Sequence, residues 1–475
     1  MTSFFCVRDQ NQTINFQPQV ICTVKLAKLN QSGFNYIERR TVATLASVYG
    51  LRMFGLFLIL PVLSIYAEQL DGATPMLMGV ALGIYGISQA MFQIPFGALS
   101  DRFGRKPLII FGLTLFVIGS LVAAFADTIV GVIIGRALQG SGAIAAVVMA
   151  LTSDLTREDQ RTKAMAFIGM SIGLAFMLAL VAAPVLASII GVRGLFVMTA
   201  LLAIMSMIVI IKVVPSPARV RNLEVNAVPV TMLAVLKNRT LLRLDCGIFI
   251  LHFVLTAMFV AIPIALLEQL QLDTQSHWRV YLPSLGASVV LMVPLIILSS
   301  RRNWTQRVFM MAVCIVLFAQ ALLLRGADNL NIMILCLTIF FLGFNLLEAM
   351  LPSLVSRLAP AATKGSAMGV YNTFQFLGVF FGGLIGGTLY GRFGVSAVYL
   401  SCAIALLIWI VIIYRTEPFK LLDSLVITVN NEVAGSDLCK VGGVEEAVVV
   451  HDDNVAYLKI DSQRLDRETL QKLIM

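Results

Sequence analysis

Long apolar stretches recur along the first 414 residues, and each is long enough to cross a lipid bilayer as one helix. A crossing helix needs about 20 predominantly apolar residues. We predict twelve spans, at roughly 41–67, 74–99, 107–126, 128–153, 163–188, 193–214, 243–269, 277–300, 305–325, 329–356, 363–390 and 394–414. Charged residues make up only 13% of the chain, about half of what is usual in a soluble protein. The sequence therefore predicts an all-α membrane protein with many crossings.

Basic residues are concentrated in alternate loops. The loops at 100–106, 154–163, 215–242, 301–307 and 357–364 each carry at least two, whereas the intervening loops carry at most one arginine. Loops rich in Lys and Arg lie on the cytoplasmic side. We therefore expect both termini in the cytoplasm, and we interpret the net charge of +9 as a topology signal, with no bound nucleic acid.

The spans divide six and six around the loop at 215–242. A shift of 203 residues lays 41–67 on 244–270 and Gly140 on Gly343. Two parallel six-helix repeats are one of the known plans of secondary transporters. We predict an N-terminal bundle at 36–214, a cytoplasmic linker at 215–242 and a C-terminal bundle at 243–414.

The two ends of the chain have a different character. Residues 1–35 are polar and show no signal-peptide pattern, and we interpret them as a disordered N-terminal extension. In 424–475, short alternating stretches and a final helix with Asp466 as N-cap predict a β-α-β-β-α order. A unit of about 50 residues has a marginal core, so docking or self-association would support it.

The loop between the second and third spans reads GALSDRFGRKP and carries Gly97, Asp101, Arg102, Gly104, Arg105 and Lys106. It resembles the signature loop of the major facilitator superfamily in both its residues and its position. The alternative is an ordinary basic turn. The resemblance covers essentially 36–414 and implies twelve helices that alternate access to a site near the membrane midplane.

Two further motifs concern how transport would be coupled to protons. Arg136, Gln139, Gly140 and Gly142 in the fourth span resemble the R-x-x-Q-G-x-G motif of proton-coupled members. Antiporters of the family usually end a glycine-rich fifth span in Gly-Pro, but this chain has Ala183-Pro184. Antiport and another coupling mode therefore both stay open.

Longer runs resemble the YajR-type transporters of bacteria: residues 51–67, 84–109, 135–146 and 346–354. That resemblance implies proton-linked efflux across the bacterial inner membrane and a small cytoplasmic α+β domain at 424–475. The domain resembles the ferredoxin-like fold of heavy-metal-associated domains. It lacks their CxxC pair and has only Cys439, so we expect no metal carriage.

Ionisable residues inside spans are costly and mark functional sites. Glu348 is our first candidate for carrying protons, because a carboxylate among apolar helices can exchange protons near neutral pH. His252, Arg136 and Arg52 are further proton-coupling candidates. Packing and interhelical hydrogen bonding are the alternative roles for these residues, and equally for a set of predicted cavity-lining residues. These are Tyr85, Gln89, Gln93, Gln139, Asn345, Asn372 and Gln375.

We interpret the signature loop as a cytoplasmic latch. Asp101 would face the positive start of the eleventh span near Thr363, since a helix N-terminus attracts an acid. Arg105 would pair with Asp154 at the end of the fourth span, as the resemblance also implies. Such a latch would stabilise the outward-facing state.

The sequence favours a transporter of small molecules and protons over an enzyme, with membrane lipid as its surroundings. We expect no cofactor and no metal, and a monomer and self-association through the C-terminal domain both stay open. A non-transporting sensor that signals through 424–475, a channel, and a proton symporter or uniporter are the alternatives.

Overall fold

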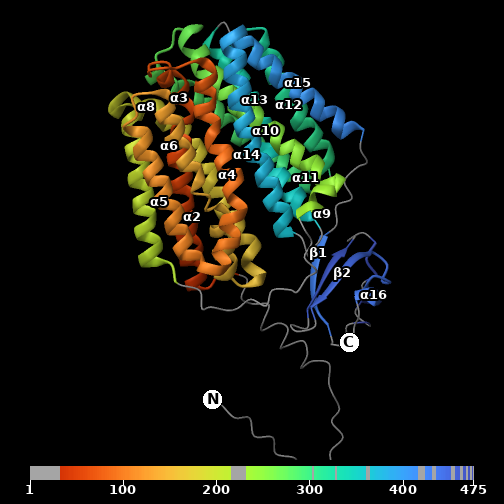
Figure 1. Ribbon diagram of the computed structural model, residues 1–475. Coiled ribbons are helices and arrows are strands. Elements are labelled where there is room, and N and C mark those ends of the chain that lie inside the picture. The colour runs from red at the N-terminus through yellow and green to blue at the C-terminus, as the bar shows by residue number, and fades with distance from the viewer. Residues whose placement is uncertain are drawn as a thin grey trace, which may run out of the picture.

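The computed structural model describes residues 33–215, 232–301, 304–326, 329–359, 364–415, 423–429, 435–450, 455–460, 464–466, 469–470 and 473. Most of the predicted extension at 1–35 and of the linker at 215–242 lies outside these residues. The described chain forms two helical bundles and a small sheet (Figure 1).

The N-terminal bundle contains α2 (Tyr36–Leu58), α3 (Leu60–Ala67), α4 (Pro75–Phe103), α5 (Arg105–Ala124), α6 (Ile129–Ser141), α7 (Ala145–Asp154) and α8 (Glu158–Val213). The C-terminal bundle contains α9 (Met232–Lys237), α10 (Arg239–Glu268), η1 (Thr274–Ser276), α11 (Trp278–Arg301), α12 (Thr305–Leu324), α13 (Leu330–Leu358), α14 (Lys364–Phe393) and α15 (Val395–Tyr414). Side-chain N-caps fix several starts: Thr74, Thr128 and Asn329 each accept a bond from a backbone N–H three residues on.

Eleven helices in the described residues are long and apolar enough to cross a membrane. One of them covers 51 residues, Lys163–Val213, and as a single helix it would be about 76 Å long, far more than the bilayer core. Gly191 interrupts it with φ 69° and ψ 169°. That φ lies in the left-handed region, which glycine adopts without strain. The break divides α8 into two spans, which agrees with the twelve that we predicted.

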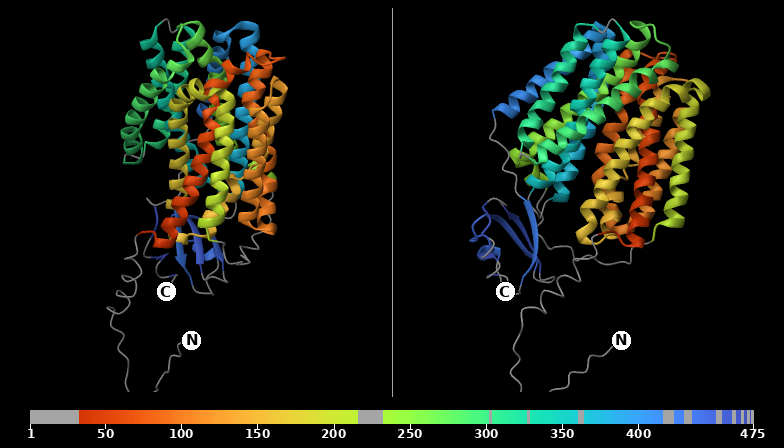
Figure 2. Two further views of the ribbon diagram at one scale, coloured as in Figure 1. Left: turned by 90° about the vertical axis from the view of Figure 1, so that its left-hand side faces the viewer. Right: turned by 180° about the vertical axis from the view of Figure 1, so that it is seen from behind.

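The two bundles contact each other mainly at one end, where α4 begins and α14 ends. A Cβ added at Gly79 would overlap the carbonyl of Gly383, and one at Gly83 would overlap backbone atoms of Phe380. Gly387 packs in the same way against the carbonyl of Pro75. Figure 2 (right) shows the two bundles meeting at one end and separating toward the other. We call these the closed end and the open end.

The uniform repeat register that we predicted holds only in part. The starts of α2 at Tyr36 and α10 at Arg239 are 203 residues apart, but those of α5 at Arg105 and α12 at Thr305 are 200 apart. The connections before the third span of each half therefore differ in length. With this offset of 200 residues, Trp304 corresponds to Gly104.

The C-terminal segment forms a three-stranded antiparallel sheet in the order β1-β3-β2, from β1 (Asp423–Thr428), β2 (Val444–Val450) and β3 (Val455–Ile460). The short helix α16 (Gly435–Leu438) lies between β1 and β2. Leu438, Leu458 and Leu470 share a small core. Asp466 accepts a bond from the Thr469 backbone N–H at 3.1 Å, as an N-cap does. The ferredoxin-like assignment stays a prediction.

Candidate functional site

The signature loop is a tight helix-to-helix turn. Helix α4 ends at Phe103, Gly104 turns the chain with φ 94°, and α5 begins at Arg105. The Gly104 N–H donates to the Ser100 carbonyl at 3.1 Å, which closes the last turn of α4. Because φ is positive here, glycine is the residue that permits so short a connection.

Two basic side chains of this loop tie it to other parts of its own bundle. Arg105 Nε lies 3.1 Å from Asp154 Oδ2 at the end of α7, the pair that the resemblance implied. Lys106 Nζ donates to the Val214 carbonyl at 2.7 Å, just after α8. The exposed Arg102 and the helical Gly97, which faces Ala146, complete the loop region. Thr363 lies outside the described residues, so the predicted partnership of Asp101 with the start of the eleventh span stays a prediction.

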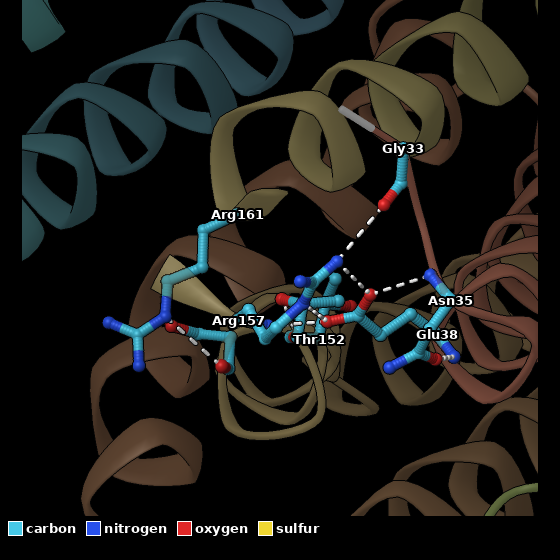
Figure 3. A network of polar contacts seen from close by, with 8 residues as sticks. Gly33, Asn35, Glu38, Thr152, Arg157 and Arg161 are labelled. Carbon is cyan, nitrogen blue, oxygen red and sulfur yellow. Dashed lines mark hydrogen bonds and ion pairs between the residues drawn. The ribbon is translucent and has the colours of Figure 1, made fainter. Parts of the chain in front are cut away.

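A second polar network at the same end was absent from our sequence predictions (Figure 3). Glu38 on α2 is buried, and its carboxylate accepts from Arg157 N and Nε, both at 2.9 Å. It also accepts from Asn35 N at 2.9 Å, closing a capping box at the start of α2. Arg157 Nη2 reaches the Gly33 carbonyl at 3.0 Å. The network joins the start of α2 to the turn before α8.

Two arginines are buried in the N-terminal bundle without a carboxylate contact among the described residues. Arg136 on α6 donates to the carbonyls of Ala81 and Leu82 and to Gln139 Oε1. Arg52 on α2 donates to Tyr85 Oη at 3.1 Å and to the Gly142 carbonyl at 2.9 Å. The acceptors of both guanidinium groups are neutral, and Arg52 Nε and Nη1 have no hydrogen-bond partner among the described residues.

The phenol of Tyr85 lies between these two arginines. Its hydroxyl accepts from Arg52, while the Arg136 guanidinium lies over its ring, 5.3 Å from the centroid. Of the predicted cavity-lining residues, Tyr85, Gln89, Gln93 and Gln139 are all buried here. In this conformation these four form hydrogen bonds between and along helices of the N-terminal bundle, the alternative role that we had considered.

The C-terminal bundle brings together three predicted residues from three helices. Gln375 Nε2 on α14 lies 2.9 Å from His252 Nε2 on α10 and donates to Glu348 Oε1 on α13 at 3.3 Å. Glu348 keeps 40% of its side chain accessible, whereas His252 keeps 9%. Asn345 is half-buried and donates to Ser288 Oγ, and Asn372 is half-buried on α14.

This three-residue cluster of Glu348, His252 and Gln375 is chemically equipped to hold and exchange a proton. With the Gln375 amide as donor, His252 Nε2 is an acceptor and the imidazole is neutral, with its proton on Nδ1. The carboxylate of Glu348, whose Oε2 is buried without a hydrogen-bond partner among the described residues, is then the group that gains or loses a proton. In the part of the chain that the structure describes, no three His, Cys, Asp or Glu side chains are grouped to hold a metal ion.

Two six-helix bundles that meet at one end, with ionisable groups inside them, are the architecture of a secondary transporter. The sequence profile of the Major Facilitator Superfamily matches residues 45–383, and the chain belongs to this family of transporters, not to an enzyme family.

One curated relative and two solved structures add to this family assignment. The chain is 43% identical to the inner membrane transport protein YajR of Escherichia coli (strain K12) over 443 residues, covering 92% of this chain and 97% of the relative. The crystal structure of a bacterial homolog of the human lysosomal transporter Spinster, inward-facing and occupied, matches with a TM-score of 0.68 at 12% identity, covering 80% of this chain and 97% of that chain. A D-xylose-proton symporter matches with a TM-score of 0.64 at 16% identity, covering 79% and 98%. The structural matches establish the fold.

Proposed function

We propose that this chain is a proton-coupled efflux transporter of the bacterial inner membrane, with both termini in the cytoplasm. The observation that carries the proposal is the cluster of Glu348, His252 and Gln375. It places a carboxylate, on a side chain that is 40% exposed as a whole, beside an imidazole inside the C-terminal bundle. The 43% identity to an inner membrane transport protein supports the location.

The conformation bears on which side of the membrane exchanges protons with this carboxylate. The bundles contact each other at the end where α4 begins, which has the arginine-poor loops, and the signature loop lies at the other end. If the arginine-rich end is cytoplasmic, this conformation is inward-facing. Glu348 would then exchange its proton with the cytoplasm in this state and with the periplasm after the bundles rock.

Coupling requires that the proton and the substrate exclude each other at the site. A proton bound from the periplasm would neutralise Glu348 and favour outward release of the substrate. Loss of that proton to the cytoplasm would restore the carboxylate for the next substrate. Asp101 and its neighbours would act as the latch on the cytoplasmic side in the outward-facing state, and the ferredoxin-like unit at 424–475 would have a regulatory or self-associating role.

The surroundings of the cluster favour an amphipathic or hydrophobic substrate. The His252 ring lies 5.9 Å from that of Phe344. Phe344 stacks on Phe176 of the opposite bundle at 6.3 Å, and Phe176 also contacts Phe259 and Phe341. Aromatic rings from both bundles thus adjoin the ionisable groups, which is the composition of many small-molecule sites.

A symporter or uniporter is the second candidate, because Ala183-Pro184 replaces the Gly-Pro that antiporters of the family usually have. A sensor that signals through the C-terminal domain would show no substrate-dependent proton flux. A channel would pass substrate downhill faster than one conformational cycle per molecule permits.

The test is a screen of amphipathic compounds on the reconstituted full-length protein, with a pH dye inside the vesicles. We expect substrate-driven proton movement in the wild type and its loss in Glu348→Gln, with folding intact by gel filtration. Glu445→Gln, an exposed change on β2, is the matched control. Full coupled transport by Glu348→Gln would remove Glu348 from the mechanism.

A further inference from the structure

A second carboxylate is buried in the C-terminal bundle, outside the cluster. Asp245 lies near the start of α10 and is only 1% exposed. Among the residues that the structure describes, neither of its carboxylate oxygens has a hydrogen-bond partner. An isolated buried carboxylate costs several kcal/mol, so such a group is either protonated or bound to water. A packing role does not account for it, because packing residues of this type are hydrogen-bonded.

A buried phenol near it is also unpartnered. Tyr371 on α14 is 3% exposed, and its hydroxyl has no hydrogen-bond partner among the described residues. Its helix, α14, packs against α10, which carries Asp245, and Tyr371 is one turn from Gln375, the residue that bonds to Glu348. Unpaired polar groups that share a buried site are commonly bridged by water.

Helix geometry arranges these groups in two layers. Asp245 precedes His252 by seven residues on α10, so both lie on one face, two turns or about 10 Å apart. Tyr371 precedes Gln375 by four residues on α14, one turn apart on one face. Helices α10 and α14 pack against each other, and both run from the open end. The pair of Asp245 and Tyr371 therefore lies on the open-end side of the cluster.

Charged and titratable groups lie near Asp245 on its own helix and on helices that pack against α10. Arg243, two residues before Asp245, donates to the Arg239 carbonyl and to the Thr240 hydroxyl. Helix α15 presents the Trp409 ring to α10 at Gly247, and α13 presents Glu348. In the described part of the neighbouring helices, the titratable groups considered with Asp245 are Tyr371 on α14 and Glu348 on α13, and the exposed Lys237 lies on α9, which packs against both α10 and α14.

We infer that Asp245 and Tyr371 form a second proton station between Glu348 and the cytoplasmic end of the C-terminal bundle. This inference rests on the proposed function. The protonated Glu348 gives its proton, directly or through water, to the Tyr371 oxygen, while the Tyr371 hydroxyl proton passes to the Asp245 carboxylate. Tyrosine is unchanged, Glu348 is left ionised, and Asp245 then releases the proton to cytoplasmic water.

The experiment needs no substrate. The full-length protein in lipid vesicles is titrated while infrared difference spectra record the bands of protonated carboxyl groups. We expect Asp245→Asn and Glu348→Gln each to remove one such band, and Asp273→Asn, an exposed change, to remove neither. Asp245→Glu should restore the missing band.

Proton release after a pH jump measures the path itself. We expect Tyr371→Phe and Asp245→Asn to slow release by about tenfold or more, since a positioned proton carrier typically contributes at least that much. Wild-type release in both variants would overturn the inference, even if Asp245 titrates. If Asp245→Asn does not fold, the proton-release rate of Tyr371→Phe and the infrared band of Asp245→Glu still test the inference. If both variants slow proton release as expected, but no substrate drives proton movement in the wild-type protein, the proposed function is overturned and the inference about Asp245 and Tyr371 stands.

Discussion

Glu348 and His252 are close but do not touch: Glu348 Oε2 and His252 Nε2 lie 3.9 Å apart, and the Gln375 amide bonds to both residues. The two titratable groups are therefore linked by hydrogen bonds through a neutral amide. A proton gained by Glu348 changes what Gln375 can donate to, and thereby changes the hydrogen bond to His252.

Gln375→Leu should uncouple the two groups while keeping the side-chain volume. We expect the proton flux per substrate to fall by about tenfold, because a hydrogen bond to a charged group is worth about 1.5–3 kcal/mol. The flux assay in vesicles measures this. Thr373→Val is the control on the same helix, since the Thr373 hydroxyl bonds only to the Gly369 carbonyl. Wild-type coupling in Gln375→Leu would show that the bridge has no role.

Arg136→Ala should impair coupling more than expression. The guanidinium joins α6 to the carbonyls of Ala81 and Leu82 on α4, so its loss removes this link between the helices and takes a charged donor from Gln139 Oε1. We expect transport to fall by about tenfold, as for the loss of bonds to a charged donor. Transport and membrane yield are measured together, with the exposed Arg392→Ala as control. A loss of yield alone would assign Arg136 a purely structural role.

Gly83→Val should shift the protein away from the closed-end contact. Its side chain would overlap backbone atoms of Phe380, and overpacking typically costs about 1–3 kcal/mol. Spin labels at Gln69 and Gln271, one on each bundle, should report a longer distance. Gly169→Val is the matched control, because nothing lies within 4 Å of a Cβ there. An unchanged distance in Gly83→Val would contradict the contact.

Glu38→Gln should lower thermal stability. The Glu38 side chain is 5% exposed and the Arg157 side chain 37%, and the change leaves Arg157 without its charged partner. We expect a cost of about 1–3 kcal/mol, measured as a lower unfolding midpoint in detergent. Asp437→Asn removes the exposed pair with Lys440 and should change the midpoint little. An equal effect of both variants would contradict the importance of burial.

Hydropathy alone predicted the spans, because a stretch of about 20 apolar residues has few alternatives to crossing a bilayer. The break at Gly191 also fits the predicted boundary between the fifth and sixth spans. Arg105 and Asp154 were paired through a family resemblance rather than by spacing.

The remaining site residues required the tertiary structure. Glu38 and Arg157 are 119 residues apart, and in the sequence Arg157 is one of many basic loop residues. Asp245 was missed because the seventh span was predicted to begin at 243, which placed an acid at its edge. The helix begins at Arg239, so Asp245 is inside the bundle and buried. The four N-terminal cavity candidates are buried in this conformation, and their cavity role stays a prediction, because polarity does not reveal which way a side chain faces.

The contact of α4 with α14 has a consequence for the speed of transport. At Gly79, Gly83 and Gly387 the two helices meet through backbone atoms, without interlocked side chains. When the helices separate at these positions, no side chain has to change its rotamer or leave a pocket on the other helix. These three contacts therefore add little side-chain repacking to the activation barrier of the rocking motion, and the aromatic contacts of Phe176 with the opposite bundle account for more of it.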